Sequence, residues 1–351
     1  MWDLWDQKSN EVFGETGMFA DCDEVRLLFP VRRIQRIFCS VTGMEYKPGL
    51  DWNFNPETER IIRPAGSRIP RFSDEDLHPS GPFYPAPDAR AVQGGTDGRP
   101  LLFDNRDFFA GHQFAVDYIA EEIDFPLEEI LSPLSGRLAR FRAKLSRGGG
   151  AMRISWLGDS ISEGYNASGY HGFPPFQPPF AELVARHLEE RFRLSVELRN
   201  HGLSGARSEY PLACLEKWSG DCPDLQVIAF GMNDFAVLDN AEKYLANIRE
   251  IVQIVQSASP ETEFLLIASM SGNPKWNNTP LEKAEEFSLA LRRFAAGAGE
   301  HVAFADLFSL WQRLLKRKTF MDLTGNGVNH PNDFGHRVFA LGVNFILERE
   351  I

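Results

Sequence analysis

From residue 151 onward, short apolar runs alternate along the chain with longer amphipathic stretches of helical period. The apolar runs, each a candidate strand, cover residues 152–157, 195–198, 225–230, 263–268 and 301–305. The candidate helices cover residues 180–192, 241–256, 281–296, 307–317 and 333–347. Strands that alternate with helices are joined by right-handed crossovers, which make the strands parallel and place helices over both faces of the sheet. The alternation therefore predicts an α/β domain built on a parallel sheet.

The first third of the chain follows a different pattern. Apolar and polar residues alternate over 25–29 and again over 114–118, and residues 37–41 form a short β-prone run. Prolines crowd the stretch between these runs, at Pro64, Pro70, Pro79, Pro82, Pro85 and Pro87. Such a density of prolines excludes a central strand or a long helix there. This part is predicted to be a smaller β-sandwich with long loops.

The segment between the two patterns is predicted to be a helix followed by a linker. Ser132-Pro133 is typical of a helix start, apolar residues recur at helical spacing up to Leu145, and a glycine triplet follows at 148–150. A chain of 351 residues is also long for one domain. We therefore expect three units: a β-sandwich-like domain over 1–130, a connecting helix and glycine linker over 131–150, and the α/β domain over 151–351.

The composition limits the partners of the chain. With a formal net charge of −12 and a pI near 5.2, it does not offer the excess of Lys and Arg that nucleic acids and anionic membranes attract. The start shows no basic segment followed by an apolar one, and no run approaches the roughly 20 apolar residues of a membrane span. We expect no nucleic-acid or membrane partner, and a cytoplasmic protein unless a leader was removed, in which case it is secreted.

Cysteine usage indicates neither a zinc site nor a disulfide framework. The four cysteines, Cys22, Cys39, Cys214 and Cys222, lack CxxC spacing. Cys214 and Cys222 are nevertheless close enough in sequence to pair. The chain is therefore expected to act without a metal ion or another cofactor.

Polar motifs follow the candidate strands, at the edge where parallel sheets carry their functional loops. Gly158-Asp159-Ser160 follows the first, a loop with Gly205 follows the second, Gly231-Met232-Asn233-Asp234 follows the third, and Asn329-His330-Pro331 lies near the carboxyl terminus. Taken singly, each motif is an ordinary turn or helix cap. Together they place a serine, a flexible backbone amide, an amide side chain and an imidazole at one edge of the sheet.

This order of blocks resembles the SGNH hydrolase family, also called GDSL esterases and lipases, over residues 151–351. The resemblance rests on Gly-Asp-Ser at 158–160, Gly205, Gly-x-Asn-Asp at 231–234, and His330 before Pro331. It implies a three-layer α/β/α domain with a five-stranded parallel sheet and a serine esterase activity. Ser160 would be the nucleophile and His330 the general base. The backbone amides of Ser160 and Gly205 and the side chain of Asn233 would form the oxyanion hole.

One departure from the family concerns the acid that orients the histidine. The family usually carries Asp-x-x-His, but Gly327 stands three residues before His330. Asp322 is the nearest upstream carboxylate and the first choice for this role. Asp333 is the alternative, although it also suits a helix cap. A Ser-His pair steadied by a backbone carbonyl is a third arrangement.

Aromatic side chains near the motifs suggest a carbohydrate substrate, because sugar rings stack an apolar face on aromatic rings. Tyr165 opens an aromatic stretch after the serine, and Trp276 lies in the loop after the fourth strand. We expect both, with Asp159 and Asn329, to bind substrate. β domains precede SGNH domains in several carbohydrate esterases, which favours a small-molecule or oligosaccharide ester, most simply an acetyl ester.

Other functions remain open from the sequence. The same residues would serve a general carboxylesterase, thioesterase or lysophospholipase. A carbohydrate-binding protein with a degenerate hydrolase domain is the non-enzymatic alternative. The first domain could bind glycan, form one wall of the cleft or mediate self-association into a homo-oligomer.

Overall fold

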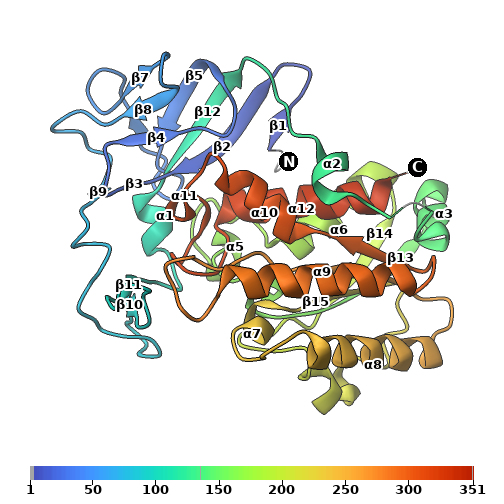
Figure 1. Ribbon diagram of the computed structural model, residues 1–351. Coiled ribbons are helices and arrows are strands. Elements are labelled where there is room, and N and C mark those ends of the chain that lie inside the picture. Colours follow the sequence, from blue (N-terminus) through green and yellow to red (C-terminus); the bar gives the residue numbers. More distant parts are fainter. Residues whose placement is uncertain (1–3, 135, 350) are drawn as a thin grey trace.

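The computed structural model describes residues 4–134, 136–349 and 351, in which a β-rich amino-terminal part lies against a carboxyl-terminal α/β part (Figure 1). The α/β part contains a five-stranded sheet whose strands all pair in parallel. Its spatial order is β14 (Ser195–Asn200), β13 (Ala151–Gly158), β15 (Leu225–Ala229), β16 (Glu263–Ile267) and β17 (Val302–Ala305). The parallel sheet predicted from the alternation is therefore present, with each strand within a few residues of its predicted bounds.

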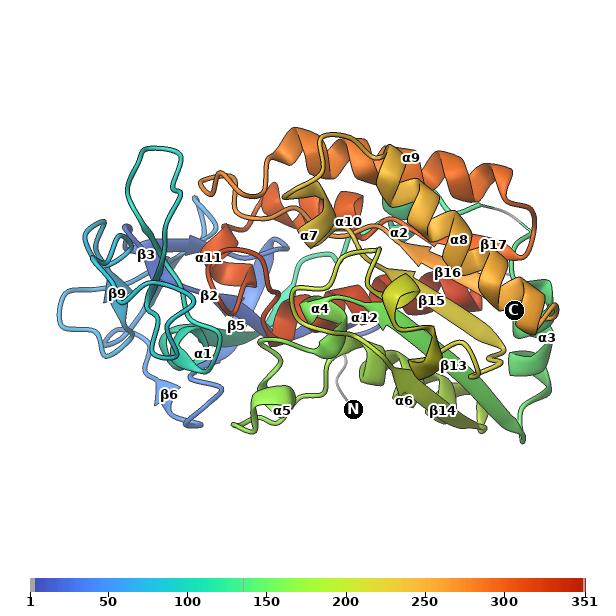
Figure 2. The same ribbon diagram turned by 90° about the horizontal axis from the view of Figure 1, so that it is seen from below.

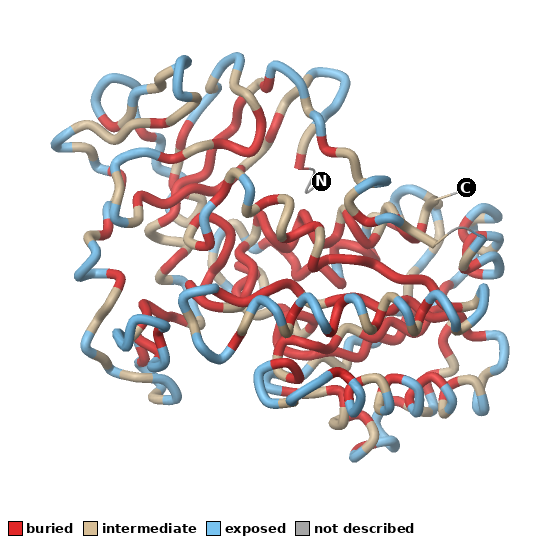
Figure 3. The backbone as a smooth tube through the Cα atoms, viewed as in Figure 1, coloured by how far each residue is buried: buried red, intermediate tan, exposed pale blue. Residues whose placement is uncertain are grey.

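The strands are apolar because helices cover both faces of the sheet. Every residue of β16 and β17 is buried, whereas the edge strand β14 is only partly buried. Right-handed crossovers place α6 (Phe180–Phe192) on one face, and α8 (Glu242–Ala258) and α9 (Leu281–Gly297) on the other. α12 (Asp333–Glu348) packs beside α6, and α10 (Leu307–Leu315) contacts α12. Figure 3 shows buried strands inside and helices whose outer sides are exposed.

The amino-terminal part is built mainly from short antiparallel strands. Its largest sheet has the order β1 (Trp5–Asp6), β2 (Glu11–Gly17), β12 (Phe114–Ala120), β5 (Val31–Phe38) and β6 (Glu45–Tyr46). A second sheet joins β4 (Glu24–Arg26), β8 (Arg60–Ile62) and β7 (Asn53–Asn55). The amino-terminal part also contains two separate strand pairs: β3 (Phe19–Ala20) with β9 (Arg71–Phe72), and β10 (Ala91–Val92) with β11 (Leu101–Leu102). The helix α1 (Phe108–His112) precedes β12.

The connecting helix differs from its prediction. Ser132 ends α2 (Leu127–Leu131) with a left-handed backbone, φ 42°, and does not begin a helix. The next helix, α3 (Ala139–Arg147), starts only after Leu138, whose φ is 58°. Pro133 accounts for part of this, because a proline disfavours helical geometry in the residue before it. The predicted helix is thus shorter than expected and begins at Ala139, and a separate short helix, α2, lies before its predicted start.

The amino-terminal part lies beyond the carboxyl ends of the parallel strands (Figure 2). One continuous cluster of buried apolar residues runs from Leu4 to Leu347 through both parts. Polar contacts add to it: Lys318 and Glu15 form an ion pair of 2.9 Å with both side chains 0% exposed. Asn332 Nδ2 also donates to Thr16 Oγ1 and Gln113 Oε1, each at 3.0 Å. The first part therefore lies next to the edge of the sheet at which the parallel strands end.

Within the described ranges, no helix is long and apolar enough to cross a membrane.

Candidate active site

Ser160 sits where the strand order of the sheet reverses. Its strand β13 lies between β14 and β15, and ligands of open α/β sheets bind at this switch point. Asp159 follows the strand directly and caps the short helix α4 (Ser160–Glu163), with its Oδ1 accepting from Ile161 N at 3.0 Å. Gly158 permits this tight turn, since a Cβ there would collide with the side chain of Ser162.

His330 meets the serine directly. Its Nε2 lies 2.9 Å from Ser160 Oγ, and the two residues come from opposite ends of the α/β part. Asn326 shapes the loop that carries the histidine: its Oδ1 accepts from the backbone amides of Val328, Asn329 and His330, each at 3.0 Å. The sequence analysis missed Asn326, although an asparagine four residues before His330 is a common turn-forming signal.

The other ring nitrogen of His330 contacts an amide. Its Nδ1 lies 2.9 Å from Asn166 Oδ1, and Asn166 is only 4% exposed. Asn166 Nδ2 donates to the carbonyl oxygens of Gly325 at 2.9 Å and Arg106 at 3.3 Å. Sequence reasoning missed Asn166, because the contact spans 164 positions and no local pattern marks it. The only signal was the absence of an acid at position 327.

Neither predicted acid occupies this position. Asp322 lies in a capping box, where Oδ2 accepts from Thr319 N at 2.7 Å, while Oδ1 accepts from Met18 N at 2.9 Å. Asp333 Oδ1 accepts from Ser168 N at 2.8 Å. Both carboxylates are engaged in contacts that fix loops, so the assignment of Asp322, or its alternative Asp333, as the partner of His330 is corrected. The third arrangement, a backbone carbonyl at His330, is replaced by the side-chain amide as well.

The predicted oxyanion donors Gly205 and Asn233 lie in the segments that follow the neighbouring strands. Gly205 follows β14, is exposed, has φ +76°, and has no atom within 4 Å of where a Cβ would stand. Asn233 follows β15 in α7 (Met232–Phe235), and its Nδ2 donates to Ala206 O at 3.0 Å. Asp234 also accepts from Ser208 Oγ at 2.6 Å. These bonds join the two loops beside Ser160, and an amide nitrogen has a second hydrogen that can face substrate.

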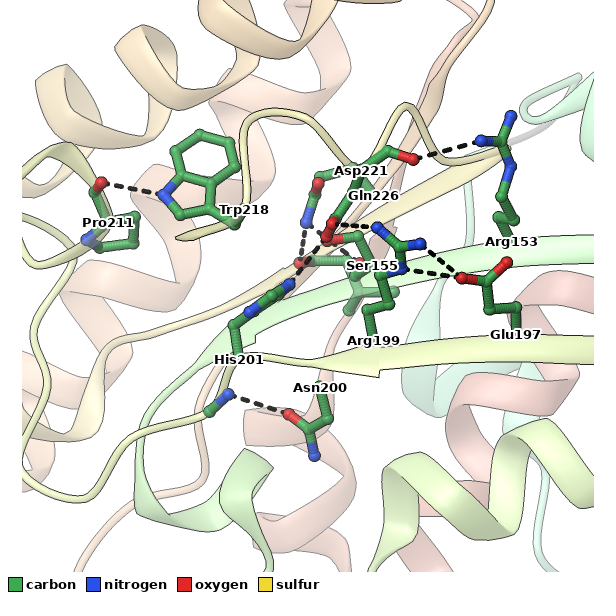
Figure 4. A network of polar contacts seen from close by, with 12 residues as sticks. Arg153, Ser155, Glu197, Arg199, Asn200, His201, Pro211, Trp218, Asp221 and Gln226 are labelled. Atoms are coloured by element: carbon green, nitrogen blue, oxygen red, sulfur yellow. Dashed lines mark hydrogen bonds and ion pairs between the residues drawn. The ribbon is translucent and has the colours of Figure 1, made fainter. Parts of the chain in front are cut away.

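A polar network anchors the Gly205 loop at its start (Figure 4). Asp221 lies at its centre and accepts from Ser155 Oγ and Arg199 Nη1 at 2.8 Å each. His201 Nε2 is 2.7 Å from the same carboxylate. Asn200 accepts from Gly202 N at 2.9 Å. The network ties the edge strand β14 to β13, so the loop that follows it has a fixed origin.

Burial controls the charges at the site. Burial, with smaller contributions from the nearby His336 and His171, lowers the pKa of His330 to about 3. His330 is therefore neutral at neutral pH, the form in which Nε2 can accept a proton. Burial raises the pKa of Asp159 to about 7, so this carboxyl is only partly ionised near neutral pH.

Residues 156–338, just over half of the chain, match the GDSL-like lipase/acylhydrolase family. The chain belongs to this family. The predicted family and its α/β fold are thereby confirmed. No curated protein sequence matches the chain.

Several solved structures are similar to this GDSL-family chain. A two-domain esterase active on acetylated mannans superposes with a TM-score of 0.50 and 20% identity, covering 63% of this chain and 56% of that one. The chain therefore spans little more than half of that esterase. An acetylxylan esterase from Geobacillus stearothermophilus is similar with a TM-score of 0.48, 18% identity and coverages of 58% and 96%. A member of the lipolytic G-D-S-L family from Veillonella parvula is similar with a TM-score of 0.45 and 16% identity, covering 56% of this chain and 99% of that one.

The predicted substrate-binding residues of this GDSL domain lie in different environments. Tyr165 is partly exposed, and its ring centroid lies 5.3 Å from that of His330. Asn329 is partly exposed, and its Oδ1 accepts from Asn326 Nδ2 at 2.8 Å. Trp276 lies against the amino-terminal part, where its indole donates to Gln93 O at 3.0 Å. Asp159 is 2% exposed and already serves as a cap. Of the four, Tyr165 and Asn329 are the two that are partly exposed beside His330.

Among the residues that the structure describes, no three His, Cys, Asp or Glu side chains cluster in a way that could hold a metal ion. Cys22, Cys39, Cys214 and Cys222 are free.

Proposed function

We propose that the chain is a serine ester hydrolase that removes short acyl groups, acetyl above all, from a carbohydrate. The 2.9 Å contact between Ser160 Oγ and His330 Nε2, at the switch point of the sheet, carries this proposal. A neutral, buried imidazole beside a hydroxyl is the pair that acyl transfer needs.

The reaction follows from this pair. Ser160 Oγ attacks the ester carbonyl as His330 Nε2 takes its proton, and the carbonyl electron pair moves to the oxygen. The amides of Ser160, Gly205 and Asn233 would hold that oxyanion. Collapse of the intermediate expels the alcohol, which takes the proton from His330. Water then attacks the acyl-serine with His330 as base, releasing the acid and restoring the serine.

The substrate class is supported by the surroundings of the serine. Tyr170 and Phe176, on the loop after Ser160, are 39% and 58% exposed. Exposed rings of this kind suit the apolar faces of sugars. The two-domain esterase with the same fold is active on acetylated mannans. Both observations favour an acetylated sugar over a lipid.

An ester panel tests the proposal. Wild-type protein and Ser160→Ala are compared on acetylated manno- and xylo-oligosaccharides and on chromogenic esters of increasing acyl length, with labelling by a fluorophosphonate. We expect acetate release that falls with acyl length, and loss of both labelling and turnover in Ser160→Ala. Turnover that persists in Ser160→Ala would contradict the proposed mechanism, in which Ser160 is the nucleophile. A preference for long acyl chains would favour a general lipase or lysophospholipase.

A further inference from the structure

We propose that the amide of Asn166 is the positioning residue for His330, in place of a carboxylate, and that the amino-terminal part imposes this arrangement. The proposal rests on the function proposed above and deepens it. It assigns a role both to Asn166 and to a part of the chain that lies outside the matched family region.

The first argument is the space at Gly327, where relatives usually carry the acid. Gly327 has φ +80°, a conformation that side chains other than glycine rarely adopt. A Cβ there would stand 2.7 Å from Leu102 O and 2.7 Å from the ring of Phe109. Both neighbours belong to the amino-terminal part and are buried. This part therefore fills the place in which a side chain at 327 would stand.

The second argument is the proton on His330. Nε2 must be free to accept from Ser160, so the hydrogen of a neutral imidazole resides on Nδ1 and needs an acceptor. Asn166 Oδ1 supplies it at 2.9 Å. The amide cannot turn its nitrogen toward the ring without losing its bonds to the carbonyls of Gly325 and Arg106. The carbonyls of Gly325 and Arg106 thus fix the orientation of the Asn166 amide, and the amide oxygen in turn fixes the tautomer of His330.

The third argument is that Asn166 is held rigidly. Its φ of +64° lies in the left-handed region, which asparagine tolerates better than most residues. Its backbone amide donates to His171 Nε2 at 3.1 Å, and His336 Nε2 lies 3.1 Å from the carbonyl of Tyr165. A Cβ on Gly325 would stand 2.5 Å from Cβ of Asn166, so glycine is needed there.

A neutral amide has a chemical consequence. It orients the imidazole but adds no negative charge, whereas a carboxylate raises the pKa of a nearby histidine. Nothing at Nδ1 then offsets the burial that holds the pKa of His330 at about 3. Because only neutral His330 can act as base, the reaction should persist well into the acid range.

Three variants test the assignment by pH profiles of kcat/KM on an activated acetate ester. Asn166→Ala should lower kcat by roughly 10- to 1000-fold with little change in KM, since an unfixed imidazole loses its working tautomer. Asn166→Asp should move the acid limb up by about one pH unit or more, because the carboxylate favours the imidazolium. Thr16→Val is the matched control: it removes bonds from Thr16 to Asp322 O and Asn332 between the two parts but does not touch the imidazole. Its pH profile should match wild type.

The Nδ1 proton of His330 gives a second readout by NMR, which should show a hydrogen-bonded signal in wild type and Thr16→Val that is lost in Asn166→Ala. The assignment is overturned if Asn166→Ala keeps kcat within about twofold, if Asn166→Asp leaves the acid limb in place, or if Thr16→Val reproduces either effect. Ser160→Ala, measured in the same assays, separates a failure of the proposed function from a failure of the Asn166 assignment. If that variant stays active, the proposed function itself fails, whatever the Asn166 variants do.

Discussion

Asp159 shows why a residue's role can be hidden from the sequence. An aspartate between a strand and a catalytic serine suits substrate binding and helix capping equally, and we predicted the former. The structure buries its carboxyl, which caps α4 through Ile161 N. Ser160 and His330 were easier to predict because their residue types carry the chemistry. Asn166 was not, since its role depends on Gly325 and on Arg106, which no local pattern connects to it.

The buried carboxyl of Asp159 predicts a pH-dependent stability. Burial raises its pKa from 3.8 to about 7, so its protonated form is favoured in the folded state. The stabilisation is complete below the unfolded pKa and is lost as the pH rises through the folded one. Asp159→Asn keeps an oxygen for Ile161 N and removes this loss. Urea unfolding should therefore favour Asp159→Asn increasingly from pH 5 to pH 7, by roughly 3 kcal/mol over that interval, and by a constant amount at higher pH. Parallel stability curves for the two proteins would contradict the assignment.

Elements were predicted well where burial is periodic and local. The helix α6 has its predicted bounds, and the other strands and helices of the parallel sheet lie close to theirs. The strand β2 was missed, because its sequence EVFGETG has no apolar alternation. Its Glu15 is buried against Lys318, a partner 303 positions away (318 − 15). No reading of neighbouring residues could show that contact.

The loop before His330 gives a prediction at this scale. Gly327→Ala should reduce the free energy of unfolding by about 1–2 kcal/mol for its left-handed backbone. Overpacking of the new Cβ against Leu102 and Phe109 should reduce the free energy of unfolding by about 1–3 kcal/mol more. Gly43→Ala is the control, since Gly43 has φ +70° but nothing within 4 Å of its Cβ position. The difference between the free energies of unfolding of the two variants, measured with urea, gives the cost of the steric contact at Gly327 alone. Equal losses would mean that the amino-terminal part yields easily at Gly327.

In the whole molecule, the two parts share a core. The sequence predicted a β-sandwich-like domain, a connecting helix and linker, and an α/β domain, without indicating how they contact one another. One apolar cluster runs through both parts, and the segment from Lys318 to Asn332 bonds to the first part on both sides of the loop that holds His330. Composition shifts mark where a chain changes pattern, but they carry no information about the surfaces that later meet. The first part therefore belongs to the site as well as to the fold.

The buried ion pair tests this unity. Lys318→Met leaves Glu15 buried without its cation, which typically costs about 3–5 kcal/mol. Glu15→Gln combined with Lys318→Met removes both charges and should recover much of that loss. If the parts fold as one unit, hydrogen exchange should show β12 and β15 losing protection together in Lys318→Met, and turnover should fall with them. If only β12 loses protection while β15 and turnover stay at wild-type values, the amino-terminal part unfolds separately. That result would show that the site does not depend on the amino-terminal part. Arg106 and Leu102 would have lost their native positions, yet His330 would still be oriented for turnover.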